Sequence, residues 1–457
     1  MTLPAGFLEA IEGIPIVVEG ESLVRKSRDN FWYSPVLRRQ FADVVAEAIV
    51  LPRGEAEVIV VAQACFRFDV PITPRGGGTA NYGQCMPIHG GIVLDLSNLD
   101  RVLWIRPGVF RVEAGIRMGV LEEALAPSGQ ELRMHPSTRD TATLGGFVAG
   151  GSGGVGSITW GMLRERGNIL GARIVTLEES PRVLELRGSD IARVAHAYGT
   201  TGIITELEMP TAPAVDWVDG VVVFNDFVTA VRFGQAFAEQ PAIVKKLGGV
   251  MAPSIAQAYL KPIREFVPEG SSCAIVMVAE ASWEPFEKLA AEFGGRVTYR
   301  KSAADVRAAG LVPAFFLCWN HTTMWALRAD PRLTYLQSSF PAGRGLALVE
   351  QLAQHFGDEV RLHLEFMRSG AGFGFAGIQL VRFTSEARLE EIMAFHESIG
   401  VRQFNPHAFT IEEGGMKQVD DVQLQYKRLV DPKGLLNPGK MRAWSDPAWA
   451  AKSRGAN

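Results

Sequence analysis

A glycine-rich stretch from Pro74 to Gln84, Pro-Arg-Gly-Gly-Gly-Thr-Ala-Asn-Tyr-Gly-Gln, constrains the fold of this chain more than any other feature. It follows Val70–Thr73, a short and partly β-branched run that predicts a strand ending in a tight loop. Because residues 76–78 are glycines without a Cβ, three successive amides can turn inward toward one anion. Arg75 adds a fixed positive charge and Thr79 a hydroxyl donor. The stretch predicts a cradle for a diphosphate, with an ordinary glycine-rich surface turn as the alternative.

The length of 457 residues predicts two or three domains. A formal net charge of -4 argues against nucleic-acid binding. The N-terminus has no basic cluster ahead of its apolar residues, which argues against a secretory signal, and no stretch approaches the roughly 20 apolar residues that span a bilayer. The four cysteines form no CxxC pattern. We therefore expect reduced thiols that bind no metal, in a cytoplasmic protein.

The pattern around the glycine loop predicts a first βαβ unit. Apolar residues at helical spacing follow Gly54, and the loop comes after the next strand. Two strands and a helix are then expected, at Ile92–Leu96, Phe110–Ala114 and Met118–Ala126. The loop is thus predicted at the carboxyl end of a strand, where α/β folds bind ligands.

A second glycine-rich segment runs from His135 to Gly156. It contains a literal GxGxxG match at Gly151–Gly156, the pattern of a dinucleotide-binding Rossmann unit. That interpretation is disfavoured because no clean strand precedes the match and Ser157–Gly161 is a poor helix start. We expect instead a long extended segment without bulky side chains, against which a flat ligand can lie.

A proline pair, Pro210 and Pro213, separates two patterns of elements and places the first domain at residues 1–213. Before this pair we expect strands at 169–177, 183–186 and 203–209 and a short helix at 191–198. Residues 214–404 alternate strands and helices without a strong repeat, which predicts an α+β domain with a mostly antiparallel sheet. Residues 405–457 form a C-terminal segment with one further helix.

Three motifs in this order resemble those of the vanillyl-alcohol-oxidase superfamily, also called the PCMH-type FAD-binding fold. They are the Pro74–Gln84 loop, the segment Pro136–Gly161 together with Gly199–Ile204, and the run Asp431–Lys440. The last motif is similar to that of FAD-linked D-2-hydroxyacid dehydrogenases and glycolate-oxidase-type subunits. The resemblance implies an α+β protein with a two-subdomain PCMH-type FAD-binding domain, a substrate or cap domain, and a C-terminal segment that returns to the FAD-binding domain.

The resemblance also implies which residues bind FAD. Those that would hold its pyrophosphate region are Arg75, Gly76, Gly77, Gly78, Thr79, Asn81 and Gln84. Those that would lie along the ribityl chain and adenosine are Pro136, Thr143, Gly145, Gly146, Gly153 and Gly154, with Gly202 and Ile203 near the adenine. Asn437 and Lys440 would approach the isoalloxazine, where a positive group stabilises the charge that hydride transfer to N5 leaves at the N1–C2 edge.

Two departures from the family pattern concern the cofactor and the metal. Members with covalent FAD often carry His at the position of Thr79, and a hydroxyl cannot form that link, so we expect noncovalent FAD. His89 lies nearby and is interpreted as an ordinary loop histidine. Metal-assisted members carry a His-rich segment that has no counterpart in Arg361–Gly377, and a later Gly-Glu-His-Gly segment appears only as Glu412–Gly415. We therefore expect no active-site metal.

Four residues of the second half are candidates for catalysis, because flavin-dependent alcohol oxidation requires a base for the O–H proton. In Val360–Met367, Arg361 and His363 alternate with apolar residues; this polar face could bind a carboxylate and accept a proton, or could face solvent. His407, shortly before Glu413, occupies a position where the resemblance places active-site groups, with a structural histidine as the alternative. Weaker candidates, because aromatic neighbours favour a core position, are His321 and Tyr335.

Together with the resemblance, these residues predict an FAD-dependent oxidoreductase that oxidises a small alcohol or 2-hydroxy acid by hydride transfer to flavin N5. The alternatives are an oxidase of a phenolic or other aromatic alcohol, a flavin-binding assembly subunit without catalysis, and a nucleotide-sugar binder that uses the same loops. The expected partners are a small-molecule substrate and an electron acceptor, which is oxygen, a quinone or a protein. A homodimer is a further open prediction.

Overall fold

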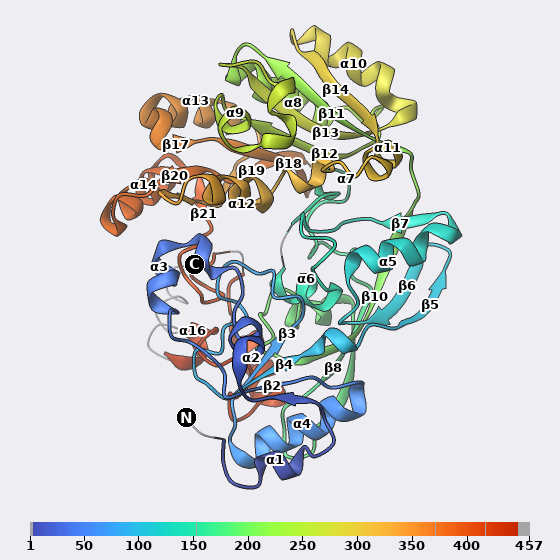
Figure 1. Ribbon diagram of the computed structural model, residues 1–457, viewed down its shortest axis with the longest axis vertical. Coiled ribbons are helices and arrows are strands. Elements are labelled where there is room, and N and C mark those ends of the chain that lie inside the picture. Colours follow the sequence, from blue (N-terminus) through green and yellow to red (C-terminus); the bar gives the residue numbers. More distant parts are fainter. Residues whose placement is uncertain (1–2, 152, 371, 416, 447–457) are drawn as a thin grey trace.

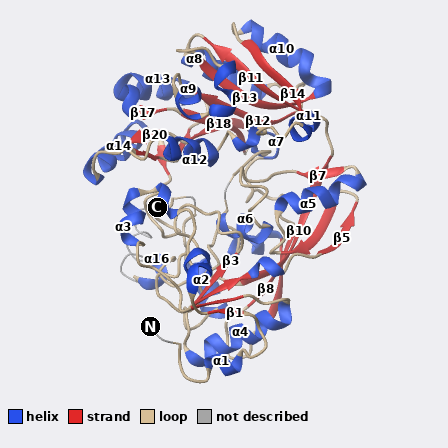
Figure 2. Ribbon diagram, in the orientation of Figure 1, coloured by secondary structure: helices blue, strands red, loops and turns tan. Residues whose placement is uncertain are grey.

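The computed structural model describes residues 3–151, 153–370, 372–415 and 417–446. Two lobes are visible in Figure 1. The first lobe contains the residues up to β10 (Ile203–Pro213) and the C-terminal segment, and the cap lobe contains the residues between. Helices and strands occur in both lobes (Figure 2), so the predicted α+β class is confirmed. Among the described residues, no helix has the length and apolar character needed to cross a membrane.

A four-stranded sheet carries the first glycine-rich loop. Its order is β1-β2-β4-β3, with β2 and β3 parallel to β4 and β1 antiparallel to β2. The strands are β1 (Ile16–Val17), β2 (Ala48–Val50), β3 (Ile72–Arg75) and β4 (Ile92–Asp95). Helix α4 (Glu55–Phe68) connects β2 to β3 and buries Val58, Val61 and Cys65 in the core beside this sheet. The loop after Arg75 therefore leaves the carboxyl end of a parallel strand, as predicted.

The second sheet of the first lobe has six antiparallel strands in the order β5-β6-β10-β8-β9, with β7 paired to the end of β10. The new strands are β5 (Val102–Arg106), β6 (Val109–Glu113), β7 (Gln130–Leu132), β8 (Gly171–Val175) and β9 (Val183–Arg187). Helices α5 (Met118–Leu125) and α6 (Leu144–Gly150) bury Leu121, Leu125 and Val148 in its core. This packing leaves the glycine-rich face of α6 toward the loop that follows β3.

An eight-stranded antiparallel sheet forms the centre of the cap lobe, in the order β14-β11-β13-β12-β18-β19-β16-β21. Its strands are β11 (Trp217–Phe224), β12 (Lys245–Met251), β13 (Ser272–Ala279), β14 (Arg296–Ser302), β16 (Ser338–Phe340), β18 (His363–Ser369), β19 (Gly372–Gly377) and β21 (Arg402–Gln403). A small sheet beside it contains β15 (Leu333–Tyr335), β20 (Leu380–Arg382) and β17 (Val360–Arg361).

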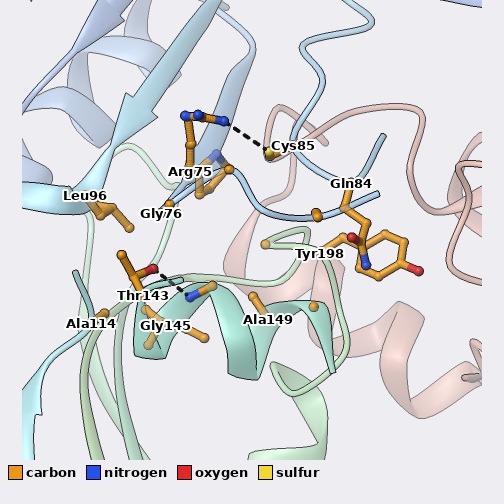
Figure 3. Close-up of a pocket in the computed structure, with 18 of the residues that line it drawn as sticks. Arg75, Gly76, Gln84, Cys85, Leu96, Ala114, Thr143, Gly145, Ala149 and Tyr198 are labelled. Carbon is orange, nitrogen blue, oxygen red and sulfur yellow. Dashed lines mark hydrogen bonds between the residues drawn. The ribbon is translucent and has the colours of Figure 1, made fainter. Parts of the chain in front are cut away.

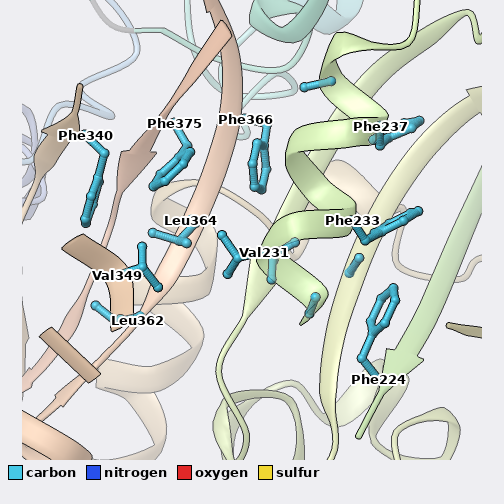
Figure 4. Packing of buried hydrophobic residues seen from close by; sticks show 14 of the residues in the cluster. Phe224, Val231, Phe233, Phe237, Phe340, Val349, Leu362, Leu364, Phe366 and Phe375 are labelled. Carbon is cyan, nitrogen blue, oxygen red and sulfur yellow. The ribbon is translucent and has the colours of Figure 1, made fainter. Parts of the chain in front are cut away.

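Helices cover both faces of the large cap sheet. On one face lie α8 (Phe227–Glu239), α10 (Trp283–Glu292), α13 (Gly345–Phe356) and α14 (Glu386–Ile399). On the other lie α9 (Ile255–Tyr259) and α12 (Asn320–Ala329). Figure 4 shows Phe233 and Phe237 of α8 packed beside Phe224 and Phe366 of the sheet. Because side chains alternate along each strand, β11 supplies Val222 to this core and Val221 to the core under α12.

The remaining helices are short or lie at the edges of the lobes. They are α1 (Phe7–Ala10), α2 (Gly20–Lys26), α3 (Pro35–Gln40), α7 (Ser157–Trp160), α11 (Ala303–Ala308), α15 (Asp421–Val430) and α16 (Arg442–Ser445). Helix α7 joins the lobes, because the Gly156 amide before it donates to the Lys246 carbonyl (2.7 Å). Lys246 also forms a buried ion pair with Glu131 of β7 (2.7 Å). Backbone and charge thus fix the cap to the first lobe at one point.

The C-terminal segment returns to the sheet that carries the glycine loop. Ile72 of β3 exchanges backbone hydrogen bonds with residues 435 and 437. The carboxylate of Asp431 accepts from the amides of Leu435 (3.0 Å) and Leu436 (2.8 Å) and pairs with the buried amine of Lys427. The motif therefore forms a closed turn that is bound along β3.

The structure corrects three predictions of local structure. The segment after His135 is not extended throughout, because Thr143 caps helix α6 by accepting from the Gly146 amide (3.2 Å). Residues 191–198 contain only the end of a short 3-10 turn (Gly188–Arg193), since His196 and Tyr198 adopt positive φ angles that no α-helix accommodates. The strand expected at 360–367 is divided at Leu362, so Arg361 and His363 belong to different sheets.

Candidate functional site

Two adjoining cavities lie where the glycine-rich segments meet. The first lies between the loop after β3 and helix α6 (Figure 3). Its lining includes ten residues predicted to bind FAD: Arg75, Gly76, Gly77, Gly78, Thr79, Gln84, Thr143, Gly145, Gly146 and Gly202. The second has a volume of about 370 Å³ and continues under the cap. It contains Asn81, Pro136, Gly153 and Gly154 of the predicted set, and shares residues such as Thr79 and Gly146 with the first.

The three glycines of the loop lie too close to their neighbours to carry a Cβ. A Cβ added to Gly76 would lie 1.9 Å from Thr143 Oγ1, and one added to Gly77 would lie 2.2 Å from the Thr141 carbonyl oxygen. Gly78 has a φ of +65°, and a Cβ there would meet the guanidinium of Arg75. No side chain other than hydrogen fits at these positions, so the loop can only be glycine.

One face of α6 is bare toward the cavities. Gly145, Gly146, Ala149 and Gly150 lie one and four residues apart, which places them on the same side of the helix. A Cβ on Gly150 would meet only Gln84 Nε2, at 3.8 Å, and would otherwise enter the cavity. A wall of glycine backbone beside the positive charge of Arg75 fits an extended, phosphate-containing cofactor such as FAD. Ala149 and Gly150 were not predicted as cofactor-binding residues, although their positions four residues after Gly145 and Gly146 could have indicated the same helix face.

Behind the loop lies a buried polar cluster that holds its ends. Arg75 donates to the Arg28 carbonyl (2.9 Å) and contacts Cys85 Sγ (3.6 Å). Burial raises the pKa of Asp29 to about 6, although Lys440 and hydrogen bonds from Cys85 and Phe31 oppose this shift. Burial lowers the pKa of the Lys440 amine to about 8. Arg75 and Cys85 also line the first cavity, so this cluster positions the loop from directly beside the cavity.

Asn437 and Lys440 reach this loop, but from behind. Asn437 Nδ2 donates to the carbonyls of Gln84 (2.8 Å) and Tyr198 (2.6 Å), and Lys440 donates to the Gly83 carbonyl. Both side chains are buried, and neither is among the described lining residues of the two cavities; the same holds for Ile203. Their amide and amine groups therefore hold protein carbonyls and shape the loop, which differs from the expected approach to the isoalloxazine.

The second cavity is lined by glycine backbone of the first lobe on one side and by polar side chains of the cap on the other. Tyr82 donates to Gln337 Oε1 (2.6 Å), and Gln337 Nε2 donates to Asn320 Oδ1 (3.1 Å). This chain of hydrogen bonds connects the loop of the first lobe to α12 across the cavity wall. No sequence pattern predicted this connection, because Tyr82 is 255 residues from Gln337.

The second cavity is positively charged. Arg164 and Arg402 line it, and none of its described lining residues is Asp or Glu. Both arginines are exposed. Desolvation and the neighbouring charge of Arg402 lower the pKa of Arg164, and Glu165 opposes the shift. Arg402 donates to the Gly415 carbonyl (2.7 Å) and lies over the ring of Phe404. Two like charges held at one cavity favour an anionic ligand there. Neither arginine stood in a recognisable motif.

Two imidazoles line the second cavity. His321 of α12 is buried with its ring 3.9 Å from that of Phe316, and no partner of its Nδ1 is found among the described residues. His196 belongs to the first lobe and has a φ of +52°. Burial lowers the pKa of both to about 4, so both are neutral at pH 7 and able to accept a proton. The sequence had ranked His321 below the other candidates.

The four predicted catalytic residues are not brought together, and none is among the described lining residues of either cavity. Arg361 contacts the hydroxyl of Tyr259, and Glu413 pairs with Arg442 on the surface. His363 is fully buried, with Nε2 2.8 Å from Glu365 Oε1. The polar face predicted for this strand therefore points into protein instead of solvent or cavity.

His407 connects three segments of the chain. Its Nε2 donates to the Tyr335 carbonyl (3.0 Å), so its Nδ1 accepts from the hydroxyl of Ser34 (2.8 Å). Burial lowers its pKa to about 4. Both ring nitrogens are used by protein groups, which is the arrangement of a structural histidine, the alternative weighed above. In the described part of the chain, no group of three His, Cys, Asp or Glu residues is placed to hold a metal ion.

Comparison with known sequences agrees with this geometry. Residues 46–183 match the family described as FAD binding domain. D-2-hydroxyglutarate dehydrogenase of Escherichia coli (strain K12) is 34% identical over 169 residues, which cover 34% of this chain and 16% of that protein. Glycolate oxidase subunit GlcD of the same strain is 28% identical over 176 residues, covering 36% of this chain and 34% of that subunit. The aligned part thus spans 16% and 34% of the lengths of these two relatives.

Comparison with solved structures shows the same fold over nearly the whole chain. Two crystal structures of alkyldihydroxyacetonephosphate synthase superpose with a TM-score of 0.73 each. The first covers 96% of this chain and 85% of the synthase, at 18% sequence identity. The likeness establishes that the cap lobe and the C-terminal segment belong to this fold, together with the matched domain.

Gly150 offers a test of the cofactor site. We expect Gly150→Leu to weaken FAD binding about tenfold or more, because the side chain fills space that the ligand needs. The helical backbone accepts leucine, so the protein folds with unchanged or higher thermal stability. The measurement is the flavin released by acid precipitation, with Ala291→Leu on the exposed face of α10 as control. Full flavin content in Gly150→Leu would show that the cavity beside α6 is not the FAD site.

His407 offers a test of the structural assignment. Its pKa is 6.5 in an unfolded chain and about 4 in the protein. Between these pH values the unfolded state binds more protons, so the free energy of unfolding falls as pH is lowered. We expect His407→Gln to remove up to about 1.4 kcal/mol per pH unit of this slope in urea unfolding experiments. The exposed His355→Gln is the control, and equal slopes in both variants would contradict the assignment.

Proposed function

We propose that this chain, which carries an FAD binding domain at residues 46–183, is an FAD-dependent oxidoreductase that oxidises the CH–OH group of a small 2-hydroxy acid. The observation that carries the proposal is the charge of the second cavity, where two arginines and no described carboxylate line the wall. This charge favours a substrate with a carboxylate over a neutral aromatic alcohol. The aligned relatives, a D-2-hydroxyglutarate dehydrogenase and a glycolate oxidase subunit, support the same class.

The first cavity would hold FAD through the loop at residues 75–79 and the bare face of α6. Bound FAD supplies the two-electron acceptor for the hydride of the substrate C–H bond. Thr79 offers a hydroxyl only, and burial raises the pKa of the Cys85 thiol to about 12, which keeps it protonated. Both features support noncovalent attachment. The proposed acceptor, oxygen, a quinone or a protein, and the proposed cytoplasmic location rest on the sequence alone.

Residues of the second cavity would bind and deprotonate the substrate. Arg164 and Arg402 attract its carboxylate, and the connection of Tyr82, Gln337 and Asn320 holds the cap at a fixed distance from the loop. We assign the role of base to His321, because its imidazole is neutral, lines the cavity, and its Nδ1 has no partner among the described residues. It accepts the hydroxyl proton as the C–H bond is broken. His196 meets the same criteria and is the alternative base.

The substrate class is tested by anaerobic bleaching of the flavin. We expect 2-hydroxy acids to bleach it and the matched diols, in which the carboxylate is replaced by CH₂OH, to fail. In Arg402→Met, KM for the acid should rise about tenfold or more, since a charge-assisted contact contributes about 1.5–3 kcal/mol. Arg296→Met, at the far edge strand β14, is the control. Equal bleaching by diols and acids would instead favour the alcohol oxidase.

The base is tested separately. We expect His321→Gln to lower kcat by about 10²- to 10⁴-fold, the usual contribution of a general base, with the flavin content unchanged. Steady-state kinetics with the best bleaching substrate measure this effect. The exposed His355→Gln should retain wild-type kcat. A large loss in His196→Gln together with normal kcat in His321→Gln would move the role to the other imidazole of the cavity.

A further inference from the structure

We propose that Trp319 sets the upper size limit of the substrate, and that Glu365 is the positioning residue that holds it. The inference rests on the proposed function for the identity of the substrate, and on the structure for the position of the wall. Trp319 is a cap residue that immediately precedes α12 and lines the second cavity. Its neighbours Asn320 and His321 line the same cavity, so its conformation also decides where the proposed base stands.

The backbone of Trp319 is held in a conformation that large residues avoid. Its φ is 53° and its ψ is -142°, in a region populated almost only by glycine. His196 and Tyr198, which also line this cavity, have positive φ angles of 52° and 51°. Strained residues that persist are fixed by their surroundings and gather at functional sites. Trp319 is therefore held in place by specific contacts.

The contact that fixes Trp319 is a buried hydrogen bond to its amide. Trp319 N donates to Glu365 Oε1 (2.6 Å), and the same oxygen accepts from His363 Nε2 (2.8 Å). Glu365 and His363 are both fully buried on β18. A desolvated carboxylate needs such donors, so the amide of Trp319 is bound strongly. His363, a catalytic candidate from the sequence, therefore acts with Glu365 behind the cavity wall.

The conformation places the indole against the first lobe. A Cβ on Gly153 would lie 3.2 Å from Cη2 and 3.4 Å from Cζ3 of Trp319, so the ring reaches from the cap to the glycine segment. A longer substrate chain in this direction meets the indole. Trp325, in the second turn of α12, provides the contrast. Its indole donates to the Phe316 carbonyl (3.1 Å), and it does not appear among the lining residues described for the cavity.

The test compares Trp319→Gly, Trp319→Ala and the control Trp325→Phe over 2-hydroxy acids of increasing chain length, beginning with glycolate. Glycine adopts the backbone conformation without strain, so Trp319→Gly removes the wall and leaves His321 in place. We expect the ratio of kcat/KM for long against short acids to rise about tenfold or more, the usual effect of a methylene-sized space. Trp319→Ala relaxes the backbone and should lose kcat as well.

The positioning role of Glu365 is tested by comparing two variants that should behave differently. Glu365→Gln keeps an oxygen for the Trp319 amide and should retain the wild-type length profile, whereas Glu365→Leu should broaden it and lower kcat. Binding of the corresponding 2-oxo acids, followed by thermal shift, measures the size limit without turnover. If wild type binds short 2-oxo acids but oxidises no hydroxy acid, the proposed function fails while the size limit is still measured. An unchanged length profile in Trp319→Gly, or no binding of any acid, overturns the inference.

Discussion

The close approach of Gly76 and Gly77 to residues 141–143 is the constraint on which the site depends. A Cβ at either glycine would overlap Thr143 Oγ1 or the Thr141 carbonyl oxygen, so neither position can carry a side chain. The contact joins a parallel sheet to an antiparallel one, and it is possible only because α6 packs its apolar face into the second sheet and leaves its glycines toward the loop. The C-terminal segment then closes the arrangement from behind, since Asn437 binds the carbonyls of Gln84 and Tyr198. The cofactor site is therefore a property of backbone shape.

The second cavity, which the cap covers, contains charged and titratable side chains that the glycine backbone of the loop and α6 does not provide. The whole chain has a formal net charge of -4, yet the second cavity gathers Arg164, Arg402 and two neutral imidazoles without a described carboxylate among its lining residues. Arg164 and Arg402 are both exposed, so solvent screens part of this imbalance. Desolvation and, after it, the charge of Arg402 lower the pKa of Arg164, whereas Glu165 opposes the shift. An anionic ligand would neutralise part of the positive charge, which links substrate class to the electrostatics of the apoprotein.

The sequence predicted the features that depend on local pattern. Strand β4 and helix α5 were expected within one residue of their observed ends, and the loop at residues 75–79 was placed at a strand's carboxyl end. A run of glycines predicts its own structural role, since a chain needs glycine mainly where the backbone makes a close contact or adopts a positive φ. The second glycine segment was harder, because α6 is a helix that sequence propensity disfavours and that tertiary packing and the Thr143 cap stabilise.

The catalytic candidates depend on contacts between distant parts of the chain, and there sequence patterns gave little. His363 alternates with apolar residues as a solvent-facing or site-facing residue does, yet its partner is a carboxylate two residues away that binds the amide of Trp319. His407 occupies the expected place along the chain but uses both ring nitrogens for Ser34 and Tyr335. Alternation along a strand shows which residues lie on the same face of the sheet. It does not show which groups from the rest of the chain pack against that face.

The strained residues show how the two lobes divide the work of pre-organisation. His196 and Tyr198 are fixed in the first lobe and Trp319 in the cap, and each lines the second cavity with a positive φ. A side chain on a strained backbone is costly to keep and persists only where its surroundings determine it completely. The fold holds these residues in conformations that are rare for their residue types, and they do not relax when a ligand binds. The wall is therefore ordered by folding, and ordering it costs no further free energy at binding. The cavity is then selective because its wall is set before the substrate arrives.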